Sequence, residues 1–290
     1  MEKSLKIGLP KGSLQQATVN LFGRAGYEIN VSSRSYFPTI DDTHISTILF
    51  RAQEMSRYVE GGIVDVGITG HDWICENDSD VVEVCELRYS KATSAPARWV
   101  LAVPAESNVQ SAHELAGGIV ATELVQVTKD YFAKKNIDVR VEFSWGATEV
   151  KARLLDGIVE LTETGSSIRA NNLRIIDELL VSTTRLIANK AAWGQKWKRE
   201  KTESLAMLLL GAIAAQQKVG LKMNVPRAQI EAVSDLLPSE KSPTVSPLAD
   251  NDYVAVEVVL EEAVERELIP QLKRLGVSGI ITYPLNKVIP

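Results

Sequence analysis

Short apolar runs alternate with amphipathic stretches along the first two thirds of the chain. The apolar runs predict strands, because a strand buried on both faces is apolar throughout. The expected strands are Leu5–Leu9, Ile63–Thr69, Val81–Leu87, Trp99–Val103, Ile119–Ala121, Val139–Phe143 and Ile158–Leu161. Apolar residues spaced by three and four predict helices between them. The expected helices are Leu14–Ala25 with Ser13 as its cap, Ala52–Glu60, Ser111–Leu115, Val125–Lys135, Thr148–Leu154 and one that starts near Ile168. This alternation predicts an α/β fold with largely parallel sheets, which bind ligands beyond the carboxyl ends of their strands.

The last seventy residues follow a different order. A stretch from Arg174 to Ala188 is expected to return the chain across a domain boundary, and a long helix is expected from about Trp193 to Gln217. After it, the pattern predicts strands Val219–Asn224, Thr244–Ser246, Tyr253–Leu260 and Gly279–Tyr283, with helices Arg227–Leu236 and Glu261–Leu275. This β-α-β-β-α-β order is that of a ferredoxin-like unit appended to an α/β body.

Composition and charge narrow the classes of function. The chain has 290 residues, enough for two or three domains, and 45% of them are hydrophobic. Its net charge of −5 disfavours a duplex nucleic-acid binder, which usually carries a basic surplus. Any anionic ligand must therefore be held by a local cationic pocket.

Metal, disulfide and membrane functions are also disfavoured. Cys75 and Cys85 are the only cysteines, and the histidines His44, His71 and His113 are scattered without metal-ligand spacing. The N-terminus leads straight into a strand pattern, and the most apolar stretch, Leu205–Ala215, is too short to span a bilayer. We expect a cytoplasmic protein that does not enter a membrane.

The segment from Glu160 to Ser167 contains the most informative candidate site. A strand ends in the acidic residues Glu160 and Glu163 and turns through Thr164, Gly165, Ser166 and Ser167 into a helix. Backbone N–H groups at a helix N-terminus, with three hydroxyls beside them, form a cradle suited to a phosphate. The two carboxylates could accept hydrogen bonds from sugar hydroxyls or bind a Mg²⁺ that bridges phosphates. An ordinary strand-to-helix turn capped by Thr164 explains the same residues equally well.

Two further strand ends carry candidate residues. Lys11, Gly12 and Ser13 lie between the first strand and its helix, where Lys11 could bring a positive charge to a second anion site. Arg51 ends an apolar run before a helix, which places it near the same sheet edge or, alternatively, in solvent. Gly70 and Asp72 mark a third glycine-bounded strand end, with Asp72 as a possible helix cap.

Taken together, these motifs resemble the long form of the ATP phosphoribosyltransferase family over essentially the whole chain. The matching segments are Leu9–Gly12, Arg51–Asp72, Glu160–Leu173 and Ser242–Leu248, of which Glu160–Leu173 is the most specific. The chain departs from the family pattern in three places. Glu160 occupies a position that is commonly aspartate, Ser13 one that is often arginine, and the stretch from Glu149 to Asp156 is shorter.

The resemblance implies a two-lobed catalytic body similar to periplasmic binding proteins. The first lobe would comprise residues 1–95 and 183–215, the second residues 96–182, and an ACT-like regulatory domain residues 216–290. The implied reaction joins N1 of the adenine of ATP to C1 of 5-phosphoribosyl pyrophosphate (PRPP) and releases pyrophosphate, as the first step of histidine biosynthesis.

The resemblance also implies the roles of individual residues. PRPP would be bound by Glu160, Glu163, Thr164, Gly165, Ser166 and Ser167, and ATP by Gly12, Ser13, Gly70 and Asp72. Lys11, Arg51 and Glu160 would be catalytic, and Mg²⁺ would accompany the pyrophosphate instead of being caged by protein ligands alone. Histidine, the feedback inhibitor, would bind near Thr244, Val259 and Gly279, and the enzyme would be a hexamer. The alternative reading is a two-lobed solute-binding or effector-sensing module without catalysis.

Overall fold

The computed structural model describes residues 3–32, 34–89, 96–238 and 243–289. The chain divides into two compact units, Met1–Ala206 and Met207–Pro290, and the division falls within the long helix α8 (Lys196–Ala214). Ser242 and the expected lobe boundary at residue 95 lie outside the described residues. Each unit has its own sheets and its own core.

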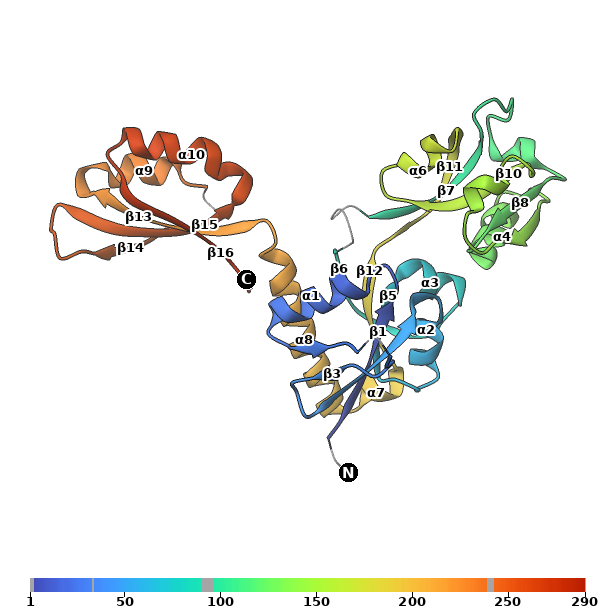
Figure 1. Cartoon of the computed structure of the whole chain (residues 1–290), viewed down its shortest axis with the longest axis horizontal. Coiled ribbons are helices and arrows are strands. Elements are labelled where there is room, and N and C mark those ends of the chain that lie inside the picture. Colours follow the sequence, from blue (N-terminus) through green and yellow to red (C-terminus); the bar gives the residue numbers. More distant parts are fainter. Residues whose placement is uncertain (1–2, 33, 90–95, 239–242, 290) are drawn as a thin grey trace. The chain divides into compact units, whose positions relative to one another are not determined.

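A five-stranded mixed sheet forms the first lobe of the first unit, with strand order β4-β1-β5-β12-β6 (Figure 1). Its strands are β1 (Leu5–Lys11), β4 (Ile45–Arg51), β5 (Val66–Gly70), β6 (Val82–Leu87) and β12 (Thr184–Ala188). Its helices are α1 (Gln15–Ala25), α2 (Ala52–Glu60), α3 (His71–Glu76) and α7 (Lys190–Gly194), and β2 (Ile29–Asn30) pairs with β3 (Thr39–Ile40) beside the sheet. The strands β4, β1 and β5 are parallel, whereas β12 runs antiparallel to both of its neighbours.

Two glycines allow α2 to lie close against this sheet. A Cβ on Gly8 would lie 2.4 Å from the sulfur of Met55, and one on Gly67 would lie 2.7 Å from Val59. Both distances are shorter than atoms tolerate, so α2 could not pack at this depth over larger residues. The close packing fixes the carboxyl ends of β1 and β5 relative to the start of α2.

A second five-stranded sheet, of order β11-β7-β10-β8-β9, forms the second lobe. Its strands are β7 (Ala97–Pro104), β8 (Ile119–Thr122), β9 (Arg140–Phe143), β10 (Gly157–Thr162) and β11 (Leu173–Ser182). Its helices are α4 (Val125–Lys134), α5 (Thr148–Lys151) and α6 (Ser166–Ala170), together with a 3₁₀ turn at Ala112–Leu115. The sheet is mixed, because β10, β8 and β9 are parallel, whereas β7 runs antiparallel to both β10 and β11.

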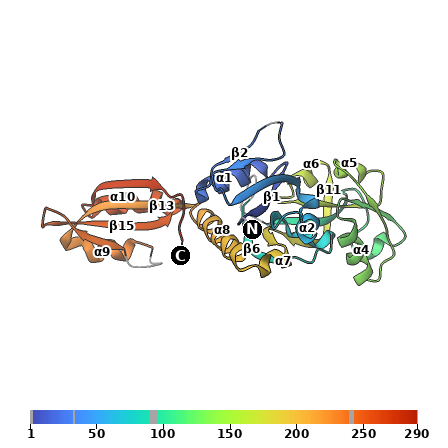
Figure 2. The ribbon, with the colours of Figure 1, turned by 90° about the horizontal axis from the view of Figure 1, so that it is seen from below.

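Helices cover both faces of the second sheet (Figure 2). Alternate residues of β7 point to opposite faces, so that Trp99 and Leu101 pack in a cluster with Phe132 of α4. Val100 packs on the other face, in a cluster with Ile168 of α6 and with Ala152 beside α5. Two apolar faces explain why β7 has a continuous apolar run instead of an alternating pattern.

The second unit is a four-stranded antiparallel sheet of order β14-β15-β13-β16. Its elements are β13 (Lys218–Pro226), a 3₁₀ turn at Arg227–Gln229, α9 (Ile230–Leu236), β14 (Thr244–Pro247), β15 (Tyr253–Glu261), α10 (Glu262–Arg274) and β16 (Ser278–Pro284). Both helices lie on one face of the sheet, over alternate apolar residues such as Val256 and Leu260 (Figure 1). The predicted β-α-β-β-α-β order is confirmed.

Three predicted helices differ from the structure in kind, continuity or capping. The helix expected from Trp193 is two helices, because the backbone at Gln195 is extended and separates α7 from α8. Leu14 and not Ser13 occupies the cap position of α1, and no side chain caps that helix. The helix expected over Ser111–Leu115 is a 3₁₀ turn.

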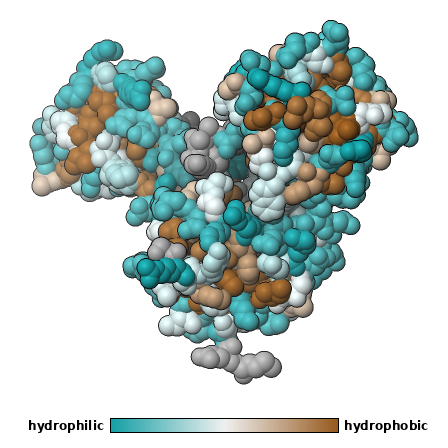
Figure 3. All heavy atoms as spheres, turned by 45° about the vertical axis from the view of Figure 1, so that its right-hand side comes forward, coloured by the Kyte–Doolittle hydropathy of each residue, from teal (hydrophilic) through white to brown (hydrophobic). Residues whose placement is uncertain are grey.

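Polar residues cover most of the surface visible in Figure 3, with apolar patches between them. None of the helices in the described part of the chain combines the length and the apolarity that a bilayer crossing requires.

Candidate active site

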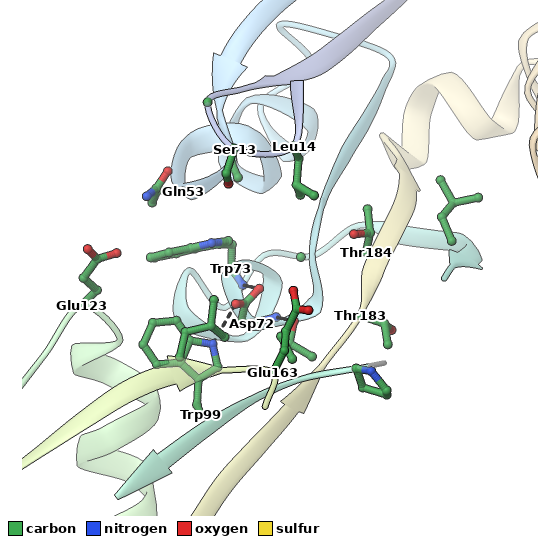
Figure 4. Close-up of a pocket in the computed structure, with 18 of the residues that line it drawn as sticks. Ser13, Leu14, Gln53, Asp72, Trp73, Trp99, Glu123, Glu163, Thr183 and Thr184 are labelled. Atoms are coloured by element: carbon green, nitrogen blue, oxygen red, sulfur yellow. Dashed lines mark hydrogen bonds between the residues drawn. The ribbon is translucent and has the colours of Figure 1, made fainter. Parts of the chain in front are cut away.

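A cavity of about 470 Å³ lies between the two lobes of the first unit. Figure 4 shows Ser13, Leu14 and Gln53 of the first lobe across this cavity from Trp99, Glu123 and Glu163 of the second. Eight of the predicted site residues line it, namely Lys11, Gly12, Ser13, Arg51, Gly70, Asp72, Glu160 and Glu163. The four remaining residues that were expected to bind PRPP, Thr164–Ser167, continue the chain beyond Glu163 and do not line it.

The first-lobe wall of the cavity is cationic. Lys11 and Arg51 end the parallel strands β1 and β4, and the strand register makes them direct neighbours. The Lys11 ammonium lies 3.6 Å from the centroid of the Tyr36 ring, a cation–π contact. Its hydrogen bond to Tyr36 lowers the pKa of that phenol. Two adjacent positive charges at the carboxyl ends of parallel strands suit a ligand with several phosphate groups.

The second-lobe wall is acidic. Glu160, near the end of β10, is largely buried, and burial raises its pKa from 4.5 to about 7. The Leu161 N–H and the Thr148 hydroxyl donate hydrogen bonds that oppose this rise, whereas the carboxylates of Glu149 and Glu123 add to it. A half-protonated carboxyl group near neutral pH can both donate to and accept from sugar hydroxyls.

Thr148 belongs to a short hydrogen-bonded chain behind Glu160. Its hydroxyl lies 2.9 Å from that of Ser144, and both residues are buried. The Lys151 ammonium donates to Ser144 Oγ over 2.6 Å. These contacts fix the side chain from which Glu160 accepts a hydrogen bond.

Asp72 faces the second lobe at the floor of the cavity. Its carboxylate accepts a hydrogen bond from Trp99 Nε1 over 2.8 Å, and its own N–H donates to Ser182 Oγ over 3.1 Å (Figure 4). Burial raises its pKa. Asp72 is not a helix cap as expected, because Gly70 occupies the cap position of α3. The carboxylate expected to contact ATP is thus engaged with an indole.

The strand-to-helix turn after β10 has the predicted position but a different hydrogen-bond pattern. Gly165 adopts a left-handed conformation with φ of 73°, and its N–H donates to Thr162 Oγ1 over 2.8 Å instead of pointing at an open site. Thr164 Oγ1 donates to Ser166 Oγ over 3.0 Å. The Arg169 guanidinium donates to the Thr164 carbonyl over 3.1 Å and so brings a positive charge to the turn.

Several cavity residues were not predicted as site residues from the sequence. Trp73 and Trp99 line the cavity and meet edge to face at 6.3 Å. Trp99, which begins an expected strand, is also buried among the apolar residues of the second sheet. Glu123, Thr183 and Thr184 follow or begin strands but form no recognisable motif. In the sequence, the one sign that these three residues could belong to a site is that each is a polar residue at or beside the end of a strand.

Comparison with known proteins assigns the chain to a family. Residues 51–211 match the model of the family described as ATP phosphoribosyltransferase, and residues 215–287 match that of the HisG C-terminal domain. The ATP phosphoribosyltransferase of Chlorobium chlorochromatii is 58% identical over 99% of this chain and 98% of its own. That of Geotalea daltonii is 55% identical over the full length of both chains.

A solved structure agrees with these relatives. The ATP phosphoribosyl transferase (HisG:HisZ) complex from Thermotoga maritima contains a chain with a TM-score of 0.62 and 26% identity. The match covers 72% of this chain and 97% of that one. With family models over both units and relatives along its whole length, the chain belongs to the ATP phosphoribosyltransferase family, in the long form that carries the HisG C-terminal domain, and is a transferase of histidine biosynthesis.

Proposed function

We propose that the inter-lobe cavity holds PRPP and ATP between its cationic and acidic walls during transfer of the phosphoribosyl group. The observation that carries this proposal is the placement of Lys11 and Arg51 beside each other, in one cavity with Glu160. The first lobe would comprise residues 1–95 and 183–215 and the second residues 96–182. The single experiment that tests the proposal is turnover of ATP, PRPP and Mg²⁺ by Arg51→Ala and Glu160→Gln, each of which should lower kcat/KM.

PRPP would span the acidic wall and the turn after it. Glu160 and Glu163 would accept hydrogen bonds from the ribose hydroxyls, and the 5-phosphate would lie on the turn from Thr164 to Ser167. The hydroxyls there and the nearby Arg169 guanidinium supply donors for an anion. Since Gly165 N–H is already bonded to Thr162, these side chains carry more of the binding than the backbone does.

The cationic wall would bind the pyrophosphate of PRPP and the triphosphate of ATP. As adenine N1 bonds to C1 of the ribose, the C1–O bond breaks and the pyrophosphate leaves with the electron pair. Lys11 and Arg51 stabilise the negative charge that grows on this leaving group. Adenine N1 is already a nucleophile, so positioning of the two substrates supplies much of the remaining rate. Gly12, Ser13 and Gly70, which line the same end of the cavity, would contact ATP.

Mg²⁺ would enter with the phosphates. Among the described residues, no group of three or more His, Cys, Asp or Glu side chains is arranged to hold a metal ion. Mg²⁺ commonly takes its ligands from phosphate oxygens and water, so the substrates would supply most of them. Such an ion would partly neutralise the pyrophosphate as it leaves.

The second unit would bind histidine as a feedback inhibitor. Thr244, Val259 and Gly279 lie on β14, β15 and β16 of one sheet. On β15, Val256 and Val258 are buried beneath the helices, so Glu257 and Val259 point to the opposite face. Thr244 pairs with Glu257 and therefore lies on the same face as Val259. Thr244→Ala should weaken inhibition by histidine without changing uninhibited turnover. We also propose a hexamer, testable by light scattering, and a cytoplasmic location.

A further inference from the structure

The N-terminus of α4, in the second lobe, is capped by a residue of the first lobe. Leu124 occupies the cap position, and its side chain makes no capping hydrogen bond. The Glu76 carboxylate instead accepts from the N–H of Gln126 over 2.9 Å and from that of Val127 over 3.0 Å. These are the N–H groups that a local Ser, Asp or Asn cap normally satisfies.

Glu76 is the last residue of α3, and the start of α3 also contacts the second lobe. Asp72 accepts the hydrogen bond from Trp99 of β7, and Trp73 meets the same indole edge to face. His71 N–H donates to the carbonyl of Thr183 over 3.0 Å, at the segment where the chain crosses between lobes. In Figure 1, α3 lies on the side of the first lobe nearest α4.

The position of Glu76 makes it sensitive to lobe rotation. His71 and Asp72 lie at the crossing segment, whereas Glu76 lies about 6 Å further along the helix at about 1.5 Å per residue. A rotation about the crossing segment therefore displaces the Glu76 contact more than the contacts of Asp72. Opening the lobes would leave the first N–H groups of α4 without their protein acceptor.

We propose that α3 is an inter-lobe latch, in which Glu76 caps α4 across the lobes and holds them in the arrangement that assembles the cavity. Its kinetic consequence rests on the proposed function, because it requires substrates to bind between the lobes. Glu76 does not line the cavity and acts as a positioning residue. Substrates bind only the assembled arrangement, so weakening the latch lowers apparent affinity and leaves the saturated rate unchanged.

The test compares three variants in steady-state kinetics. Loss of a cap is worth about 1 kcal/mol, so Glu76→Ala should raise KM for PRPP by up to about fivefold at unchanged kcat. Glu76→Gln keeps a neutral acceptor oxygen and should raise KM less, and it serves as the measured variant if Glu76→Ala does not fold. The matched control is Asn189→Ala, which removes the cap of α7 within the first lobe, where Asn189 Oδ1 accepts from Ala192 N–H over 3.0 Å. This control should lose stability but keep the wild-type KM.

Small-angle scattering provides a readout that needs no turnover. Ligand-free Glu76→Ala should scatter as a more open particle than the wild type and Asn189→Ala. Scattering and KM that match the wild type would overturn the latch, as would an equal rise in KM for Asn189→Ala. An inactive wild type would refute the proposed function instead, and the scattering comparison would still decide the latch.

Discussion

Replacing Glu160 by Gln should stabilise the ligand-free protein in a way that depends on pH. Burial raises the pKa of Glu160 in the folded state from 4.5 to about 7. The folded state therefore binds this proton more tightly than the unfolded state does. The associated stability is fully present below pH 4.5 and is lost as pH rises through 7, because the folded protein must then hold a buried carboxylate.

The size of the effect follows from the same values. One pKa unit corresponds to about 1.36 kcal/mol. The raised pKa therefore lowers the free energy of unfolding by about 3 kcal/mol at pH 8, but by only about 1 kcal/mol at pH 5. A neutral Gln avoids this loss and can still accept the hydrogen bonds from Leu161 N–H and Thr148. Solvent at the cavity mouth screens part of the charge, so we expect Glu160→Gln to gain about 2 kcal/mol at pH 8 and less than about 1 kcal/mol at pH 5.

Thermal unfolding at the two pH values measures the gain directly. For a chain of this size, about 2 kcal/mol corresponds to a rise in Tm of roughly 4–8 °C at pH 8. Glu106→Gln, which changes an exposed carboxylate of the same lobe, is the control and should show no such difference. Glu160→Gln should also lose kcat/KM, since active-site groups commonly trade stability for function. An equal Tm change at both pH values, or a lower Tm at pH 8, would refute the assigned burial of Glu160.

The remaining predictions concern the turn, the cationic wall and the second unit. Gly165→Val forces a branched residue into a left-handed conformation and places a Cβ 2.9 Å from Arg169. The free energy of unfolding should therefore fall by about 1–3 kcal/mol, and PRPP turnover should be abolished. Calorimetry and an activity assay check these two effects, and near-normal turnover would contradict the prediction. Arg51→Ala should lower kcat/KM roughly 100-fold at unchanged Tm. The control is Arg57→Ala, in the helix α2 that follows Arg51 but outside the cavity, and it should leave the rate unchanged. Equal rates for Arg51→Ala and Arg57→Ala would count against the cationic wall. In Gly220→Ala a Cβ would lie 2.3 Å from the end of the Tyr283 ring, so the ring must move aside and give up its hydrogen bond to Glu257. The Tm of the second unit should fall by an amount equivalent to about 0.5–1.5 kcal/mol, and an unchanged Tm would contradict the packing.

Elements with a strong local period were predictable from the sequence. The β-α-β-β-α-β order of the second unit is an example, since β15 alternates buried and exposed residues and α10 has an apolar stripe. The antiparallel direction of β7 and β12 was not predictable, because a strand buried on both faces looks the same in either direction. The break at Gln195 depends on a single extended residue after Gly194, which a periodic pattern does not register.

The candidate site was predictable where its residues share one local turn or end neighbouring strands of a parallel sheet. Glu160 through Ser167 form one local turn, and Lys11 and Arg51 end strands that a parallel sheet brings together. The Asp72–Trp99 hydrogen bond joins two lobes, and neither residue carries a local sign of the other. Trp99 begins an apolar run and is buried as that run predicts, but the run does not show that its indole N–H donates to Asp72. The occupation of Gly165 N–H by Thr162 depends on backbone geometry that residue spacing does not define.

A crystal structure with PRPP and Mg²⁺ bound tests the two-walled cavity most directly. We predict density for the 5-phosphate against Thr164–Ser167, ribose hydroxyls within hydrogen-bond distance of Glu160, and pyrophosphate beside Lys11 and Arg51. Pyrophosphate bound away from both cations, with the turn after β10 empty, would contradict the proposed roles of the two walls.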